Sequence, residues 1–319
     1  MKNIYIYIFI IVSIFETNNL FSQQDLMTNN KFDNLSIINP AFRPLHQRQS
    51  LVFHHRSQWT GFEGAPTTDM IVFNSKVFLD NIAMGGALIN DNIGPTNNFE
   101  IRYNFNYSIK ITKTSNVVFG SSLGINVMSN HLNNITIGTP NDVAFAYDAT
   151  KAIMPNLGIG VYYYSYQFYA GLSIPKFIQS KKGINHTGKG FTHLQRHYYL
   201  IAGSKLRINN RDKYLFEPKF LLKVTKGAPI QYDLNLDFLI SYSYIIGLAY
   251  RSGDIIGINL GVDIANDLTL LYSFGYSFSN TSFQYNGGSH EIMLRYLFPN
   301  FRRVNKTKKR HRLGKGNRA

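Results

Sequence analysis

Apolar and polar residues alternate along most of this chain with a period of two. In the segment FEIRYNFNYSIKI (residues 99–111), aromatic and aliphatic residues hold the odd positions, and Glu, Arg, Asn, Ser and Lys hold the even ones. Because successive side chains of a β-strand point to opposite faces, this pattern predicts a strand with one apolar and one polar face. The same alternation recurs in residues 232–240, 254–263 and 268–278.

Turn signals divide the pattern into 14 predicted strands. The strands cover residues 49–59, 67–77, 81–89, 99–111, 117–129, 156–164, 167–174, 196–207, 215–224, 229–239, 243–251, 254–263, 267–277 and 288–298. The connections after even-numbered strands are short, whereas several after odd-numbered strands are long: 60–66, 90–98, 130–155, 175–195 and 278–287. An even number of strands, with tight turns at one end and loops at the other, is typical of an outer-membrane barrel.

Composition indicates what each face contacts. The chain has 21 Tyr and 24 Phe, and only 16% of its residues are charged, against about 25% in soluble domains. The polar face is rich in Gly, Ser, Asn and Thr, whereas an exposed soluble face is usually rich in Lys and Glu. We therefore expect an all-β fold, a transmembrane outer-membrane β-barrel of 14 antiparallel strands, with Arg102 and Lys110 inside it or near a rim. A secreted all-β sandwich or propeller is the alternative.

The first 22 residues have the features of a signal peptide. Lys2 provides the positive start, an apolar run extends from Ile4 to Phe15, and Ser22 precedes the predicted cleavage point. The apolar run has 12 residues, too few for a membrane-spanning helix, which needs about 20. We expect an exported protein without a membrane helix.

The rest of the chain is predicted to have three parts. Residues 23–48 contain no clear strand; they are expected to form a plug in the lumen, a cover over the periplasmic mouth, or an unstructured lead-in. The barrel occupies residues 49–298. Residues 299–319 form a basic C-terminal tail.

Charge is concentrated in that tail. Nine of the 33 Lys and Arg lie in the last 18 residues, which contain no acidic residue. An even-stranded barrel begins and ends on one side, so the tail is expected in the periplasm, where nucleic acid is a poor partner. Anionic lipid, peptidoglycan or an acidic periplasmic protein are the candidate partners, and a solvated, disordered tail is the alternative.

The sequence offers no recognisable catalytic or metal site. It lacks Cys, which excludes disulfides and thiolate ligands. His54 and His55 are adjacent, so on a strand they point to opposite faces and cannot chelate together. The other His residues are scattered, and nucleophile-elbow, phosphate-loop and zinc-protease motifs are missing. A hydrolase assembled from distant strands is left open, but we expect no enzyme, no metal and no cofactor.

Five motifs, in this order and spacing, resemble the PorP/SprF family of type IX secretion system outer-membrane proteins. They are INPAFRP (38–44), HRSQWTGFEGAPTT (55–68), INDNIGPTNN (89–98), PNLGIGVYYYSYQFYAGLSIP (155–175) and HEIMLRYLF (290–298). The resemblance covers roughly residues 35–298. It implies a 14-stranded outer-membrane barrel associated with protein secretion, surface attachment of secreted adhesins and, in some bacteria, gliding motility. It implies no enzymatic role.

Two of these motifs supply candidate partner-binding loops. One interpretation is a rigid turn. In it, Gly61 and Gly64 adopt backbone conformations that other residues rarely adopt, and Pro66 favours an extended backbone where the next strand begins. Trp59 then lies at the membrane interface. The other is a docking surface formed by both loops, which follow odd-numbered strands and should face the same, external side. The candidate residues are Trp59, Gly61, Phe62, Gly64, Pro66, Asn90, Asp91, Gly94, Pro95 and Asn97.

The alternation predicts a non-catalytic barrel of the outer membrane, and the resemblance implies that it partners type IX secretion components or anchors a secreted surface protein. The alternative is an outer-membrane pore or a transport barrel for hydrophobic solutes, since Gly, Asn and Ser are compatible with a polar channel lining.

Overall fold

The structure is a computed structural model, and it describes most of the chain between residues 28 and 299. The described residues are 28–43, 48–61, 63–76, 81–130, 149–178, 181–183, 191–193, 195–208, 214–241, 243–253, 255–278 and 287–299. The predicted signal peptide, residues 300–319 of the predicted tail and Phe62 lie outside them. Within the described residues, no helix is long and apolar enough to cross a membrane.

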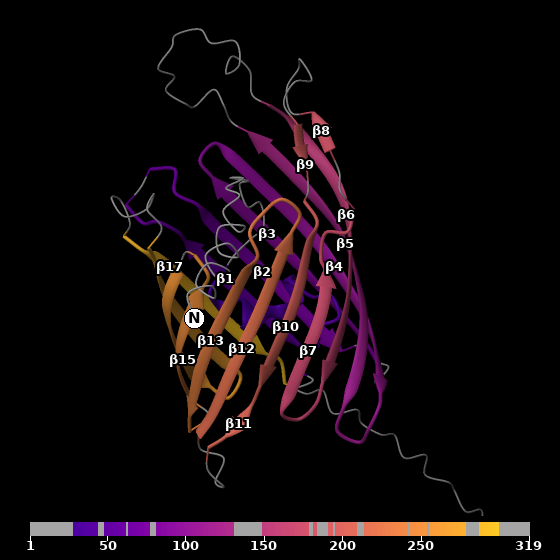
Figure 1. The fold of residues 1–319 in the computed structure, drawn as a ribbon, viewed down its shortest axis with the longest axis vertical. Coiled ribbons are helices and arrows are strands. Elements are labelled where there is room, and N and C mark those ends of the chain that lie inside the picture. Colours follow the sequence, from indigo (N-terminus) through magenta and orange to yellow (C-terminus); the bar gives the residue numbers. More distant parts are fainter. Residues whose placement is uncertain are drawn as a thin grey trace, which may run out of the picture.

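Fourteen antiparallel strands form one closed barrel (Figure 1). Each wall strand pairs with its neighbours along the chain, including β10 with β12, and pairing between β1 and β17 closes the wall. The strands are β1 (Ser50–Ser57), β2 (Thr67–Lys76), β3 (Ile82–Ile93), β4 (Thr96–Lys110), β5 (Asn116–Asn130), β6 (Ala149–Tyr164), β7 (Phe168–Ile174), β10 (His197–Ser204), β12 (Tyr214–Thr225), β13 (Gln231–Ile240), β14 (Tyr244–Arg251), β15 (Ile255–Ala265), β16 (Leu268–Ser277) and β17 (Ser289–Leu297). The short β11 (Leu206–Arg207) pairs with β12, and β8 (Lys181–Gly183) and β9 (Phe191–His193) form a separate hairpin.

This architecture confirms the predicted barrel and its strand number. The prediction of a long loop over residues 90–98 was wrong, because β3 and β4 pair as far as Ile93 and Thr96 and leave only Gly94 and Pro95 in the turn. Likewise β6 begins at Ala149, seven residues before the predicted start. In these segments the hydrogen-bonded pairing of the strands continues beyond the strictly alternating part of the sequence. A prediction from periodicity alone therefore made the strands too short.

The two faces of the wall have the predicted polarity. On β4, Ile101 and Tyr103 point outward and are 51% and 47% exposed, whereas the inward-facing Glu100 and Arg102 are buried. Lys110 lies exposed at the end of the same strand. An apolar exterior with a polar interior requires a surrounding solvent that is itself apolar.

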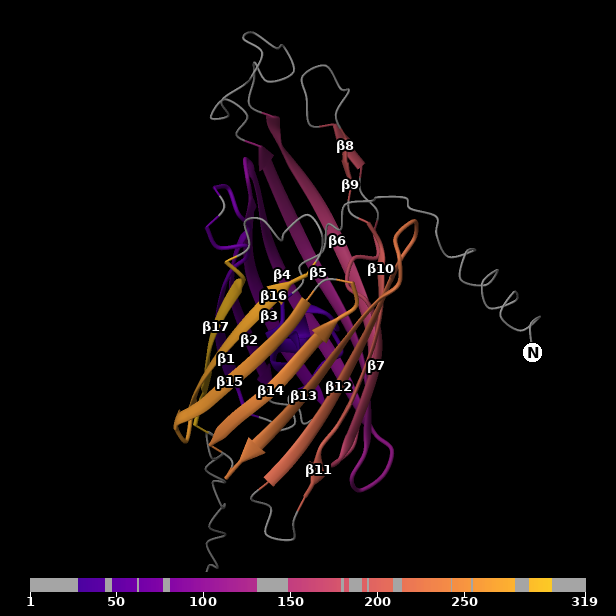
Figure 2. The same ribbon diagram turned by 60° about the vertical axis from the view of Figure 1, so that its left-hand side comes forward.

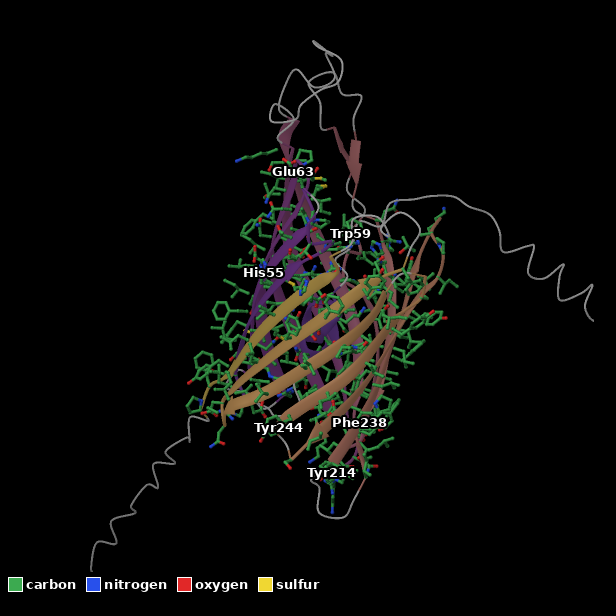
Figure 3. The ribbon with its side chains drawn as sticks, turned by 90° about the vertical axis from the view of Figure 1, so that its left-hand side faces the viewer. His55, Trp59, Glu63, Tyr214, Phe238 and Tyr244 are labelled. Carbon is green, nitrogen blue, oxygen red and sulfur yellow. The ribbon has the colours of Figure 1, made fainter. Side chains whose placement is uncertain are left out.

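Exposed tyrosines mark both ends of the apolar exterior, and Figure 3 labels two of them, Tyr214 and Tyr244, at one end. Tyr163, Tyr214, Tyr244 and Tyr296 lie at the end with short turns, which we call the turn end. Tyr198, Tyr232, Tyr250 and Tyr276 lie at the opposite end, which we call the loop end. Two such aromatic girdles are typical of membrane barrels, because amphipathic rings favour the boundary between hydrocarbon and water.

Residues 28–43, which we call the lumen segment, lie inside the ring of strands (Figure 2). The segment includes the 3-10 helix η1 (Asn30–Ile37). Leu35 is 1% exposed and Asn39 is fully buried. The lumen of the barrel is therefore occupied by this chain.

Candidate functional site

The turn between β1 and β2 projects from the loop end, where Figure 3 labels Trp59 and Glu63. The turn is closed at its base by a hydrogen bond from Gln58 N to Pro66 O of 2.9 Å. Gly61 and Gly64 have φ angles of 97° and 74°, in a region that favours glycine. The sequence therefore specifies this turn locally, through glycines at the positions that need them.

The β1–β2 turn is hydrogen-bonded to neighbouring segments on both sides. On one side, Gly94 N donates to Gly64 O at 3.0 Å, which joins it to the β3–β4 turn. On the other side, Thr60 N donates to Gly288 O at 3.0 Å and Gly287 N donates to Thr60 O at 3.1 Å, next to the start of β17. These bonds fix the two turns relative to each other and to the two residues that precede β17.

The β3–β4 hairpin is stiffened by its own polar side chains. Asn97 Nδ2 donates to the Oδ1 atoms of Asn90, at 2.8 Å, and Asn92, at 2.5 Å. Asp91 points to the other face of the wall and accepts a 2.6 Å hydrogen bond from Thr68 Oγ1 on β2. Asn90, Asp91 and Asn97 therefore hold the position of the turn, and they leave Gly94 exposed at its tip.

Trp59 does not project freely from the wall. Its φ angle is 52°, unusual for a bulky residue, and the side chain is half-buried with the indole N–H enclosed. That N–H makes no hydrogen bond to the described residues. A backbone held in this region costs free energy of roughly 1–3 kcal/mol, which the surrounding turn must offset.

We call residues 58–61, 63–66, 90–97 and 287–288 the loop cluster. It unites the described candidate residues, whereas Phe62 lies outside the described part of the chain. Sequence reasoning missed Thr60, Gly287 and Gly288, although NGG at 286–288 is the kind of sequence that marks a turn. The exposed members include Gly61, Glu63, Ile93 and Gly94, so the cluster offers a rigid surface of backbone and small residues with one acid and one aliphatic side chain.

The loop cluster has no evident catalytic constellation. Among the described residues of the whole chain, no group of three or more His, Asp or Glu side chains is placed to hold a metal ion. Rigid exposed loops on a fixed scaffold are instead typical of binding surfaces.

Comparison with known proteins gives one family and a common fold. The family model described as "Type IX secretion system membrane protein PorP/SprF" matches residues 20–296. No curated protein gives a significant match. Among solved structures, the CymD monoaromatic hydrocarbon channel superposes with a TM-score of 0.50 at 9% identity, covering 86% of this chain and 94% of that one. Omp33 of Acinetobacter baumannii gives a TM-score of 0.44 at 8% identity, covering 79% and 98%.

The likeness to these structures concerns the fold alone, because the identities are so low. The family model is a different kind of evidence, since it matches most of the chain. Together with the closed barrel and its two aromatic girdles, the match gives the outer membrane as the location. The chain belongs to the PorP/SprF family of type IX secretion system membrane proteins.

Proposed function

We propose that this protein is a non-catalytic barrel that attaches a secreted surface protein, such as an adhesin, to the type IX secretion apparatus through the loop cluster. The observation that carries the proposal is the hydrogen bonding of the β1–β2 turn to the β3–β4 turn and to Gly287 and Gly288 before β17, which gives one rigid surface. A rigid binding surface loses little conformational entropy when a partner docks, and this favours affinity. Long loops of outer-membrane barrels face outward, so the loop end would face the cell surface.

Other parts of the proposal follow from the sequence. A signal peptide in residues 1–22 would deliver the chain to the periplasm. The basic tail would extend on the periplasmic side, toward an anionic partner. Gliding motility would depend on this protein in a bacterium whose adhesin it holds.

We expect the substitution Gly64→Val to reduce surface attachment of the secreted partner about tenfold, the factor that corresponds to 1.4 kcal/mol of lost binding. A β-branched residue is strained at the φ of 74°, and a Cβ there would lie 3.5 Å from Gly94 Cα. The turn would shift relative to its two neighbours. Surface attachment is measured by antibody labelling of intact cells, normalised to the amount of barrel in the outer membrane.

Gly253→Val is the matched control. Gly253 also lies in a turn at the loop end and has a φ of 78°, but nothing lies within 4 Å of its Cβ position and it is not part of the loop cluster. Equal losses in the two variants would refute docking at the loop cluster. A loss of all secreted proteins in Gly64→Val cells would instead identify the protein as a core part of the apparatus.

A further inference from the structure

The lumen segment runs from the loop end toward the turn end. At its start, Thr28 O accepts a 3.1 Å hydrogen bond from Nη2 of Arg251, the last residue of β14 at the loop end. Near its other end, Phe42 O accepts a 3.3 Å bond from Nδ2 of Asn106 on β4. Beyond the segment, Arg48 donates to the carbonyl of Phe298 at the turn end.

Wall side chains on several strands bind the backbone of the segment. Asn104 Nδ2 donates to Ser36 O at 3.0 Å, and Ser173 Oγ donates to Ile38 O at 2.9 Å. These two residues belong to β4 and β7, so the segment is bound across the lumen. Both acceptors are main-chain carbonyls of the segment. Serine and asparagine side chains of the wall can donate to such carbonyls whatever side chains the segment carries.

One buried acid holds the outer end of the segment. The carboxylate of Glu291, on β17, is fully buried and accepts the backbone N–H of Asn29 at 2.8 and 2.9 Å and that of Asn30 at 3.1 Å. The same carboxylate pairs with Arg56 Nε at 3.0 Å and lies 3.3 Å from His54 Nε2. Glu291 thus joins the segment to two adjacent strands, and we call this contact the latch.

The wall is shaped to receive the inner end of the segment. A Cβ at Gly120 on β5 would overlap the backbone of Pro40 and Ala41. On the adjoining β6, a Cβ at Gly160 would overlap the Asn39 side chain. Only glycine allows this close approach, so these inward-facing glycines provide the space in which residues 39–41 lie.

The segment shares a buried apolar cluster with the wall, in which Leu35 lies with Tyr162 and Ile201, but the rest of its contact with the wall is incomplete. A cavity of about 200 Å³ separates it from the turn-end half of the wall, bounded by residues that include Phe32, Tyr169 and Arg295. The side-chain amides of Asn29, Asn30 and Asn34 make no hydrogen bond through Nδ2 to the described residues although they are buried. The polar part of this interface is incompletely satisfied, so it loses little free energy when water replaces it.

We propose that the lumen segment is a displaceable plug that closes a polar conduit. The wall behind it carries Asn104, Asn126, Asn235, Asp237 and Asn259, all buried. Side chains of this kind can be solvated once the plug leaves. The opened conduit conducts hydrated ions and small polar solutes and excludes apolar ones. This inference is independent of docking at the loop cluster.

The experiment is conductance of the full-length purified protein in planar lipid bilayers. The wild type is expected to stay closed for most of the time. Gly120→Val removes the space for Ala41, and Glu291→Gln weakens the latch. Each substitution is expected to raise the mean conductance about tenfold or more, the factor expected when a two-state equilibrium shifts by 1.4 kcal/mol.

Gly124→Val is the matched control. Gly124 lies on the same strand as Gly120, and a Cβ there would meet only wall atoms, the nearest being Ile101 O at 3.3 Å. Its conductance is expected to equal that of the wild type. Equal conductance of Gly120→Val and Gly124→Val, or a wild type that is already open to the same extent, would overturn the proposal.

A disulfide provides a second test that does not depend on a disruptive substitution. The chain has no Cys, and Ser273 Oγ lies 2.6 Å from Asn30 Oδ1, so Asn30→Cys combined with Ser273→Cys places two thiols at the latch. We expect oxidation of this variant to abolish openings and reduction to restore them. If the openings are unchanged by oxidation, or absent from both redox states, the conduit is not closed by this segment and the proposal fails.

Discussion

Replacing Glu291 with Ala is expected to lower the free energy of unfolding of the barrel by roughly 3–5 kcal/mol, the usual cost of removing one partner from a buried ion pair. The carboxylate is fully buried, and Arg56, its partner at 3.0 Å, is only 5% exposed. The substitution removes the buried carboxylate that pairs with this guanidinium and that accepts hydrogen bonds from the N–H groups of Asn29 and Asn30. The midpoint of urea unfolding in lipid vesicles measures the loss.

Glu63→Ala is the control for this prediction. Glu63 is an exposed acid in the loop cluster, and surface substitutions usually change stability by about 0.5 kcal/mol or less. If Glu291→Ala unfolds at the same urea concentration as Glu63→Ala, the interior of the barrel is already well hydrated. The ion pair between Glu291 and Arg56 would then contribute little to stability.

Sequence reasoning predicted the wall well because its physical basis is local. Within each strand, the side-chain period of two is imposed by backbone geometry, and contact with lipid on one side makes the alternation strict. Near the ends of β3 and β4 the paired positions are polar, as with Asn92 and Asn97, which pair directly. There the alternation of hydrophobicity disappears although the strands continue. Those ends could not be found from periodicity.

The contents of the lumen could not be predicted in the same way. Three interpretations of residues 23–48 were open, because the segment is held by contacts with residues far away in the sequence, such as that between Asn29 and Glu291. Glu291 holds a polar position in the alternating segment 290–298, as other inward-facing residues do. The local sequence is the same whether an inward-facing carboxylate is solvated by water or accepts hydrogen bonds from the backbone of the lumen segment.

The loop cluster is intermediate between these cases. The conformation of the β1–β2 turn follows from Gly61 and Gly64, which the sequence displays. Its contact with Gly94 was expected in outline, since both loops follow odd-numbered strands. Its contact with Gly287 and Gly288 depends on the pairing of β1 with β17, which closes the barrel, and ring closure brings together the two ends of the chain that are farthest apart.

The substitution Leu123→Arg is expected to destabilise the folded barrel by roughly 2–4 kcal/mol, the cost of a lipid-facing Arg at the membrane midplane. Leu123 points outward at the middle of β5 and is 62% exposed. Its neighbour Ser122 faces the lumen and is 3% exposed. Reversible unfolding in vesicles, followed by the mobility of unheated protein on gels, measures the difference from the wild type.

Ile111→Arg tests whether hydrocarbon is the cause. Ile111 is 59% exposed, as Leu123 is, but it lies just beyond the end of β4 at the turn end. There an Arg reaches the interface, and the expected cost falls to about 0–1 kcal/mol. Such a dependence of the lost stability on depth is specific to a bilayer. If water surrounded the barrel, both positions would have the same solvent and the two substitutions would cost the same. Equal losses at Leu123 and Ile111 would mean that lipid does not contact this face of β4 and β5.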